Sequence, residues 1–305
     1  MSISSSTGHD GTTNYTQTLT VGTSVTLTAP ATVSDITFTG WTGDVNSSNQ
    51  TISFSMNGDK TVTANYEPTN MVWVSINDPG VSGHEGFSGQ MSKYETTNAQ
   101  CCQFLNAALA TGDITVSGDY VYGASGSNSG ADYVGQVYYD LAGAGFSYDN
   151  ATNGGATRIN YSGGVFTVDS GFENHPVTYV SWYGATALCN YYGYRLPTEW
   201  EWQAVADYDG SFTYGCGTSI NNSIANYYGS THPDGTTVVG TFGTYGYGLC
   251  DMAGNVYEWT STVNSSSRVI RGGSWFYTGD YCPVSYGPSN SASTVDFNLG
   301  FRVCR

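Results

Sequence analysis

The sequence predicts an α+β protein preceded by a small all-β module, and three observations lead to this prediction. Residues 1–68 alternate apolar and hydroxyl side chains, the pattern of strands with one buried face. A polar break, Glu-Pro-Thr-Asn at 67–70, separates this stretch from a larger unit in which helices can be placed by their caps. The composition, with 40 Gly and 25 Tyr against 8 Lys plus Arg, favours strands and loops over a helix bundle.

The first unit, residues 1–68, is predicted to be a small β-domain. The stretches TQTLTVGTSVTLTA and QTISFSMNGDKTVTANYE alternate, and NGD at 57–59 predicts a turn between strands. The run GWTGDVNSSNQTISFSMNGDKTVTANYE resembles the bacterial surface repeat related to the internalin B-repeat. The resemblance implies a spacer or adhesin segment, and we favour a generic β-module with no ligand of its own.

The second unit, residues 71–305, is predicted to contain two amphipathic helices. The first follows Thr96-Thr97-Asn98, and its apolar face carries Cys102, Leu105 and Leu109. The second follows Ser181, and its apolar face carries Trp182, Ala185, Cys189 and Tyr192.

A third helix start lies in RLPTEWEWQAVAD, residues 195–207. Thr198 is a good N-cap, and Glu201 stands three residues later to complete a capping box. Between the first two helices, residues 111–175 are rich in Gly, Ser, Asn and Tyr. This segment has too few aliphatic residues for a core of its own, so we expect irregular hairpins that decorate the fold.

Charge and hydropathy exclude several classes of function. A formal net charge of −16 argues against a nucleic-acid surface, which needs a basic stripe, and against anionic membranes. No apolar run of membrane-spanning length occurs, so no membrane insertion is expected. The first thirty residues lack a signal-peptide pattern, which leaves export by another route or a leader outside this sequence.

The cysteines and histidines predict no zinc site and no catalytic group. The seven cysteines include no CxxC pair, and their disulfide pairing is left open. The four histidines, His9, His84, His175 and His232, show no ligand spacing and stand beside no nucleophile motif.

Five motifs carry a resemblance that covers most of residues 71–305. They are SKYETTNAQCCQFLNAA, HPVTYVSWYGATALCNYYGYRLPTEWEWQAVA, GLCDMAGNVYEWT, RVIRGGSW and LGFRVCR. In order and spacing they resemble the formylglycine-generating enzyme (sulfatase-modifying factor) family, whose domain is a variant of the C-type lectin fold. The resemblance implies that RLPTEWEW and His175 belong to the scaffold.

The resemblance also bears on copper. It implies that oxidase members bind Cu(I) through two cysteines five positions apart, just after GGS, since soft thiolates suit this ion. The matching positions here are Tyr277 and Cys282. One thiolate is not enough for two-coordinate copper, so we expect no copper and no oxidase activity.

Calcium is the cofactor that the resemblance leaves open. It implies oxygen ligands in GNVWEW-like segments, and Asn255 and Glu258 stand in the matching GNVYEW. Asn226 and Asp234 resemble a second site of this kind. The alternative is that Asn255 and Glu258 only hydrogen-bond the fold together.

The segment FYTGDYCPVSYGPSNSASTVDFN, residues 276–298, shows neither helical nor strand periodicity and is interpreted as an exposed loop. It contains no Lys, Arg, Gln, Glu, Met or Trp. Codons randomised from asparagine and read as NNC cannot encode Lys, Gln, Glu, Met or Trp, so such randomisation would explain all of these absences except that of Arg. Aromatic residues among small polar ones are also typical of a paratope.

With its position, this pattern resembles the variable proteins of diversity-generating retroelements, which place randomised residues between RGGSW-like and GFRV-like motifs. We expect a binding face made of Phe276, Tyr277, Thr278, Asp280, Tyr281, Pro283, Ser285, Tyr286, Ser289, Asn290, Ser291, Ser293, Asp296, Phe297 and Asn298.

The sequence thus predicts a secreted or cell-surface display protein that binds a protein or glycan ligand on another cell or particle. A formylglycine-generating-type oxidase and a purely structural adhesin module are the alternatives.

Overall fold

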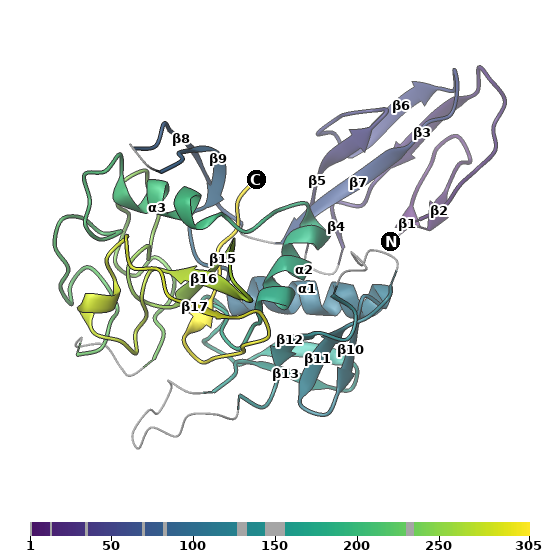
Figure 1. The fold of residues 1–305 in the computed structure, drawn as a ribbon. Coiled ribbons are helices and arrows are strands. Elements are labelled where there is room, and N and C mark those ends of the chain that lie inside the picture. The colour runs from purple at the N-terminus through teal and green to yellow at the C-terminus, as the bar shows by residue number, and fades with distance from the viewer. Residues whose placement is uncertain are drawn as a thin grey trace. The chain divides into compact units, whose positions relative to one another are not determined.

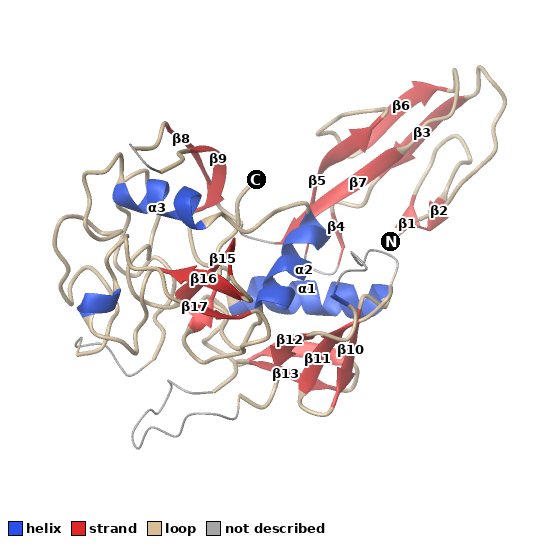
Figure 2. Cartoon of the chain, viewed as in Figure 1, coloured by secondary structure: helices blue, strands red, loops and turns tan. Residues whose placement is uncertain are grey.

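The structure is a computed structural model that describes residues 2–12, 14–33, 36–68, 71–81, 84–126, 133–143, 156–229 and 235–305. It divides into two compact units, Met1–Met71 and Val72–Arg305 (Figure 1). Figure 2 shows that strands make up the first unit, whereas the second combines strands with helices. The α+β prediction with an all-β unit in front is therefore confirmed.

The first unit is built from short antiparallel pairs. Its strands are β1 (Ser2–Ile3), β2 (Gly11–Thr12), β3 (Ser24–Thr28), β4 (Thr32–Val33), β5 (Ile36–Gly43), β6 (Thr51–Ser55) and β7 (Val62–Pro68). They pair as β1-β2, β3-β6 and β4-β5-β7. The alternation places Val25, Leu27 and Ile52 in a core around Trp41, while hydroxyl side chains face outward.

The helices of the second unit begin where their caps predict. They are α1 (Asn98–Thr111), α2 (Trp182–Tyr192) and α3 (Glu199–Asp207), with N-caps Thr97, Ser181 and Thr198. Thr198 and Glu201 form the predicted capping box. Gly112 and Gly193 end α1 and α2 in the left-handed conformation, at φ of 76° and 73°.

The strands of the second unit form several small sheets. They are β8 (Trp73–Asp78), β9 (Phe87–Ser92), β10 (Ile114–Ser117), β11 (Tyr120–Gly123), β12 (Val137–Asp140), β13 (Ile159–Ser162), β14 (Val165–Val168), β15 (Tyr257–Asn264), β16 (Ser267–Arg271), β17 (Ser289–Ser291) and β18 (Leu299–Gly300). Between α1 and α2, β10-β11-β12 and β13-β14 are antiparallel, so hairpins do occupy that segment.

The sheet that positions the C-terminal motifs has the order β17-β16-β15-β18. β18 runs parallel to β15, with Tyr257 opposite Leu299, while β16 and β17 are antiparallel to their neighbours. The main core lies where α3 meets β8 and β9, and Trp202, Met91 and Phe87 are its large buried members.

The Trp and Phe side chains of the motifs are buried, with one exception. Trp182, Trp202, Trp275 and Phe301 are buried. Trp200 is only half-buried, and its ring packs at a tilt against that of His84, with centroids 4.3 Å apart.

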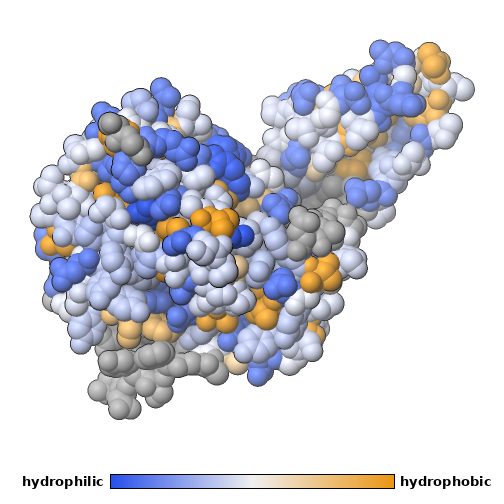
Figure 3. All heavy atoms as spheres, viewed as in Figure 1, coloured by the Kyte–Doolittle hydropathy of each residue, from blue (hydrophilic) through white to orange (hydrophobic). Residues whose placement is uncertain are grey.

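None of the described helices has the length and apolar composition needed to cross a bilayer. On the face drawn in Figure 3, apolar residues form small separate patches among hydrophilic ones. All seven cysteines are free and buried.

Candidate functional site

Residues 276–298, which we call the C-terminal segment, are fixed at both ends by aromatic packing. Trp275 donates its backbone N–H to the Asn255 carbonyl at 2.9 Å, and its ring lies 5.5 Å from that of Phe297. Phe276 completes the contact, 5.0 Å from Phe297. The two ends of the segment therefore lie side by side.

Between its ends the segment is held by backbone hydrogen bonds rather than left as a free loop. It contains the short 3₁₀ helix η2 (Gly279–Tyr281), and β17 adds to the edge of β16. Val284 N–H donates to the Thr213 carbonyl at 2.9 Å. The carbonyls of Ala292 and Asp296 accept from backbone N–H groups near the start of α2. The interpretation as a loop is thus wrong at η2 and at β17, which is ordered by pairing with β16.

The side chains of the segment differ in exposure. Those open to solvent are Tyr277, Thr278, Asp280, Tyr281, Ser285, Tyr286, Ser291 and Ser293, and the half-buried ones are Phe276, Pro283, Ser289, Asn290 and Asp296. Phe297 and Asn298 are buried at 6% and 5% exposure. The prediction that these two belong to an exposed face is wrong, because Phe297 fills the aromatic anchor and Asn298 donates to Ser274 Oγ at 3.2 Å.

Tyrosine rings dominate the exposed part of the segment. Tyr277 and Tyr281 have centroids 5.0 Å apart, and Tyr281 and Tyr286 lie 5.3 Å apart with perpendicular planes. The rings of Tyr257, on β15, and Tyr277 have centroids 5.8 Å apart. The pKa of Tyr257 is raised, first by burial and then by the neighbouring phenol of Tyr286. Tyr228 adjoins them, since its backbone N–H donates to the Tyr277 carbonyl at 2.9 Å. Sequence reasoning missed Tyr228 and Tyr257, which lie far from the segment in the chain.

The donors at the position of the family's copper site do not fit copper. Cys282 is fully buried with Cys216, Ala225 and Ala253, and burial raises the pKa of its thiol to about 12. A Cβ on Gly273 would stand 2.5 Å from its sulfur, so the thiol is tightly packed. Tyr277 packs its ring against that of Tyr281, and its phenol is not a soft ligand. A neutral, enclosed thiol and a phenol are poor ligands for Cu(I).

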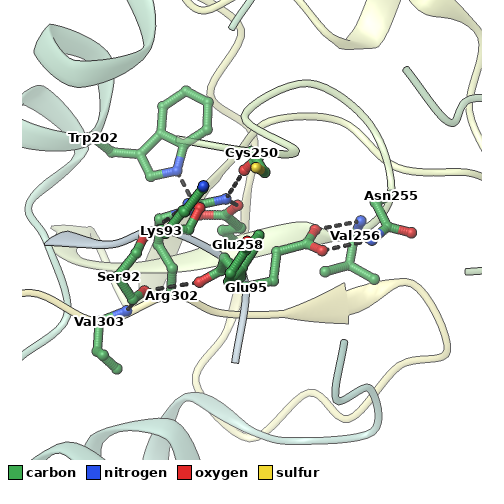
Figure 4. Close-up of polar contacts among 11 residues, drawn as sticks. Ser92, Lys93, Glu95, Trp202, Cys250, Asn255, Val256, Glu258, Arg302 and Val303 are labelled. Carbon is green, nitrogen blue, oxygen red and sulfur yellow. Dashed lines mark hydrogen bonds and ion pairs between the residues drawn. The ribbon is translucent and has the colours of Figure 1, made fainter. Parts of the chain in front are cut away.

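Glu258 is likewise poorly suited to calcium. Its carboxylate accepts two hydrogen bonds from Arg302, at 2.6 and 2.7 Å, and one from the Trp202 indole at 2.6 Å (Figure 4). Both oxygens therefore already have cationic or N–H partners within the fold. A calcium ion would have to displace a buried guanidinium to reach them.

Asn255 and Asn226 are buried beside each other and hydrogen-bond within the fold. Asn255 Oδ1 accepts from Thr237 N–H at 2.9 Å, and Asn226 Nδ2 donates to the Gly235 carbonyl at 2.9 Å. Asp234, the other predicted ligand beside Asn226, lies outside the described residues. Among the described part of the chain, no cluster of three His, Cys, Asp or Glu side chains is arranged to hold a metal ion.

The second unit contains a buried charge cluster that consists of Glu95, Asp251, Glu258 and Arg302. Glu95 accepts from Asn255 Nδ2 at 2.6 Å and from the Val256 N–H at 3.1 Å (Figure 4). Arg302 also donates to the carbonyls of Ser92 and Cys250, at 3.2 and 2.9 Å. One guanidinium faces three carboxyl groups, so their charges are not balanced unless protons are bound.

The electrostatics of this cluster follow from its burial. Burial, then the charges of Asp251 and Glu258, raises the pKa of Glu95 well above its ordinary value. Burial raises the pKa of Asp251 to about 6, against a hydrogen bond from Gly240 N–H that lowers it. All four side chains are buried and hydrogen-bonded within the fold, and we assign them a structural role. The motifs that carry two of these acids, SKYE and GLCDMAGN, gave no sign in the sequence that their acids would meet.

The histidines form no catalytic arrangement in the described residues. His175 Nδ1 lies 2.9 Å from Thr236 Oγ1, and burial lowers its pKa. His84 stacks on Trp200, and His9 lies in the first unit beside Thr7. His232 lies outside the described residues.

Comparison with known sequence families gives two matches. Residues 84–305 match the sulfatase-modifying factor enzyme 1-like domain, and residues 1–70 match the divergent InlB B-repeat domain. Both resemblances inferred from the motifs are therefore confirmed.

Curated relatives include enzymes and an inactive homologue. Serine/threonine-protein kinase pkn1 of Chlamydia caviae is 34% identical over 49% of this chain and 27% of its own length. The formylglycine-generating enzyme of Mus musculus is 33% identical over 43% of this chain and 44% of its own. The inactive Cα-formylglycine-generating enzyme 2 of Bos taurus is 34% identical over 42% and 49%. The chain thus spans between about a quarter and a half of these relatives' lengths.

Among solved structures, Treponema denticola variable protein 1 shares the fold. The two superpose with a TM-score of 0.50 at 17% sequence identity, covering 82% of this chain and 97% of that protein. The predicted C-type lectin-type fold is confirmed by this likeness and by the family match.

Proposed function

The chain belongs to the sulfatase-modifying factor enzyme 1-like domain family, and on that premise we propose that it is a ligand-binding display protein, not an oxidase. In this proposal the C-terminal segment is a diversified surface carried on a stable C-type lectin-type scaffold. The ligand is a protein or glycan on another cell or particle, and the protein acts outside the cell or on its surface.

One observation carries the proposal: the backbone of the C-terminal segment is held by the fold while many of its side chains project to solvent. The Thr213 carbonyl accepts a hydrogen bond from its main chain, and the backbone N–H groups of Tyr179 and Trp182 donate to its carbonyls. Backbone–backbone bonds do not depend on the identity of the exposed side chains. Such a surface can therefore change its chemistry without loss of the core, and its preformed shape lowers the entropy lost on binding.

The relatives support the scaffold and leave the activity to experiment. The curated relatives include both a formylglycine-generating enzyme and an inactive homologue, so membership of the family does not decide catalysis. The Treponema denticola protein is called a variable protein, whereas variation of the C-terminal segment in this chain is part of our proposal.

A display library tests the proposal directly. The exposed positions to randomise are Tyr277, Thr278, Asp280, Tyr281, Ser285 and Tyr286, while Cys282, Phe297 and Asn298 stay fixed. We expect most members to fold with melting temperatures close to that of the parent, and binders to unrelated target proteins to be selectable. A library that is mostly unfolded would show that these positions are structural. In sibling copies of the gene, differences spread evenly along the chain would argue against natural diversification.

The oxidase alternative is tested with copper and a CxPxR-type peptide. We expect no tight one-to-one Cu(I) binding in a competition titration and no oxidation of the peptide's cysteine, because Cys282 is an enclosed neutral thiol without a thiolate partner at Tyr277. Turnover would establish the enzyme instead.

A further inference from the structure

Three exposed tyrosines of the C-terminal segment and one that is hydrogen-bonded to it make up what we call the tyrosine patch: Tyr277, Tyr281, Tyr286 and Tyr228. Their exposed fractions are 38%, 38%, 37% and 57%. Ring contacts at 5.0 and 5.3 Å join the three that lie within the C-terminal segment. Tyr228 comes from outside the segment, and its backbone N–H donates to the Tyr277 carbonyl, which holds its main chain beside that residue.

Two acidic side chains of the C-terminal segment, Asp280 and Asp296, lie near the tyrosines. Asp280 is exposed in η2, directly before Tyr281. Burial of the Tyr277 phenol raises its pKa, and the nearby carboxylate of Asp296 is the next contribution. The segment itself contains no Lys or Arg.

Two arginines of β16 lie beside the segment: Arg268, opposite Asn290, is half-buried with its guanidinium 4.1 Å from the centroid of the Trp182 ring, and Arg271 is neutralised by an ion pair. The guanidinium of Arg271 lies under Gly287, where an added Cβ would stand 2.9 Å from its central carbon. Arg271 is buried and ion-paired with Glu199 at 2.6 Å, so it offers no positive charge to a ligand. With a net charge of −16, the whole chain also attracts cationic partners and repels anionic ones.

Ring faces and carboxylates favour the same ligand chemistry. The faces of tyrosine rings carry partial negative charge and attract ammonium and guanidinium groups. A planar guanidinium both stacks on such faces and hydrogen-bonds to carboxylates.

From this complementarity we propose that the tyrosine patch binds an arginine side chain, or less tightly a lysine, presented by a basic segment of a partner protein. The ring faces contact the cation, and Asp280 and Asp296 supply the opposite charge. This inference rests on the proposed function, because it specifies the chemistry of the ligand that the display face receives.

Binding of two matched peptides to the full chain tests the inference. The probe is a fluorescein-labelled peptide of alternating arginine and glycine, compared with one in which glutamine replaces arginine. At physiological salt we expect the arginine peptide to bind at least about fivefold more tightly in fluorescence anisotropy. Tyr281→Ser and Tyr286→Ser should each weaken it about fivefold, whereas Tyr286→Phe should bind as wild type because the ring face remains.

Tyr161→Ser is the matched control, since Tyr161 on β13 is equally exposed at 36% and adjoins no member of the patch in the contacts described. It should leave binding unchanged, and melting temperatures show that each variant is folded. If the patch variants bind as wild type does, bulk negative charge explains the attraction and the inference fails. It fails equally if arginine and glutamine peptides bind alike.

Selection from a random peptide library separates this failure from failure of the display function. Peptides that lack Arg and Lys, yet lose binding when the exposed residues of the C-terminal segment are exchanged, would overturn the cation inference and leave the display function standing. If no selected peptide depends on the segment, both fall.

Discussion

The buried charge cluster and the C-terminal segment lie in one unit but relate to their side chains in opposite ways. In the cluster, side-chain hydrogen bonds hold the chain together: Arg302 donates to Glu258 and to the carbonyls of Ser92 and Cys250. In the segment, main-chain hydrogen bonds make the connections, and side chains such as Tyr281 and Tyr286 face solvent. The difference teaches that tolerance to substitution depends on which atoms hold a region together.

The largest expected effect comes from removing the cation of the cluster. Arg302→Met keeps most of the side-chain volume but leaves Glu258 buried without its partner. We expect a loss of roughly 3–5 kcal/mol in the free energy of unfolding, measured by urea denaturation. Arg305→Ala is the control, because Arg305 is exposed at the chain end. A similar loss in both variants would show that charge pairing is not what distinguishes the cluster.

A second pair of substitutions tests which side chains of the C-terminal segment are part of the core and which are not. Phe297→Ala should cost about 3 kcal/mol, because it opens a cavity against Trp275 and Phe276. Tyr286→Ala should cost only about 0.5 kcal/mol, as expected for an exposed side chain. Thermal and urea unfolding of the pair measure the contrast, and equal losses would mean that the whole segment is structural.

The pH dependence of stability should reveal the excess acid in the cluster. The folded-state pKa of Asp251, about 6, lies above its ordinary 3.8, so folding favours the protonated form. Its contribution is fully present below pH 4 and is lost as pH rises from about 4 to 6. The raised pKa of Glu95 extends the loss to higher pH.

Comparison with Asp251→Asn isolates this effect. Relative to that variant, wild type should lose on the order of 1–3 kcal/mol of unfolding free energy between pH 4 and pH 7. Asp280→Asn, at an exposed position, should show no such difference. Parallel curves for wild type and Asp251→Asn in urea unfolding at successive pH values would contradict the proposed proton uptake.

The smallest expected effect is that of calcium. Because Arg302 and Trp202 occupy the carboxylate of Glu258, we expect EDTA and millimolar Ca²⁺ to leave the melting temperature unchanged. A rise with calcium that disappears in Asn226→Ala would instead place an ion beside Asn226 and Asp234. That result would retain the second of the two predicted calcium sites.

The sequence by itself determined the local features of this protein. Thr97, Ser181 and Thr198 mark the helix starts because a cap bonds to an N–H two or three residues away. Alternation in 1–68 identified strands, and five motifs in order identified the family and its fold.

Only the tertiary structure decided which residues of the candidate site face solvent and which meet. Phe297 and Asn298 turn inward, Trp200 remains half-exposed, and Tyr228 joins the tyrosines of the C-terminal segment. Glu95, Asp251, Glu258 and Arg302 come from separate stretches of chain and meet in one buried cluster. Burial and proximity depend on which distant segments pack together, and neither composition nor periodicity within a window contains that information.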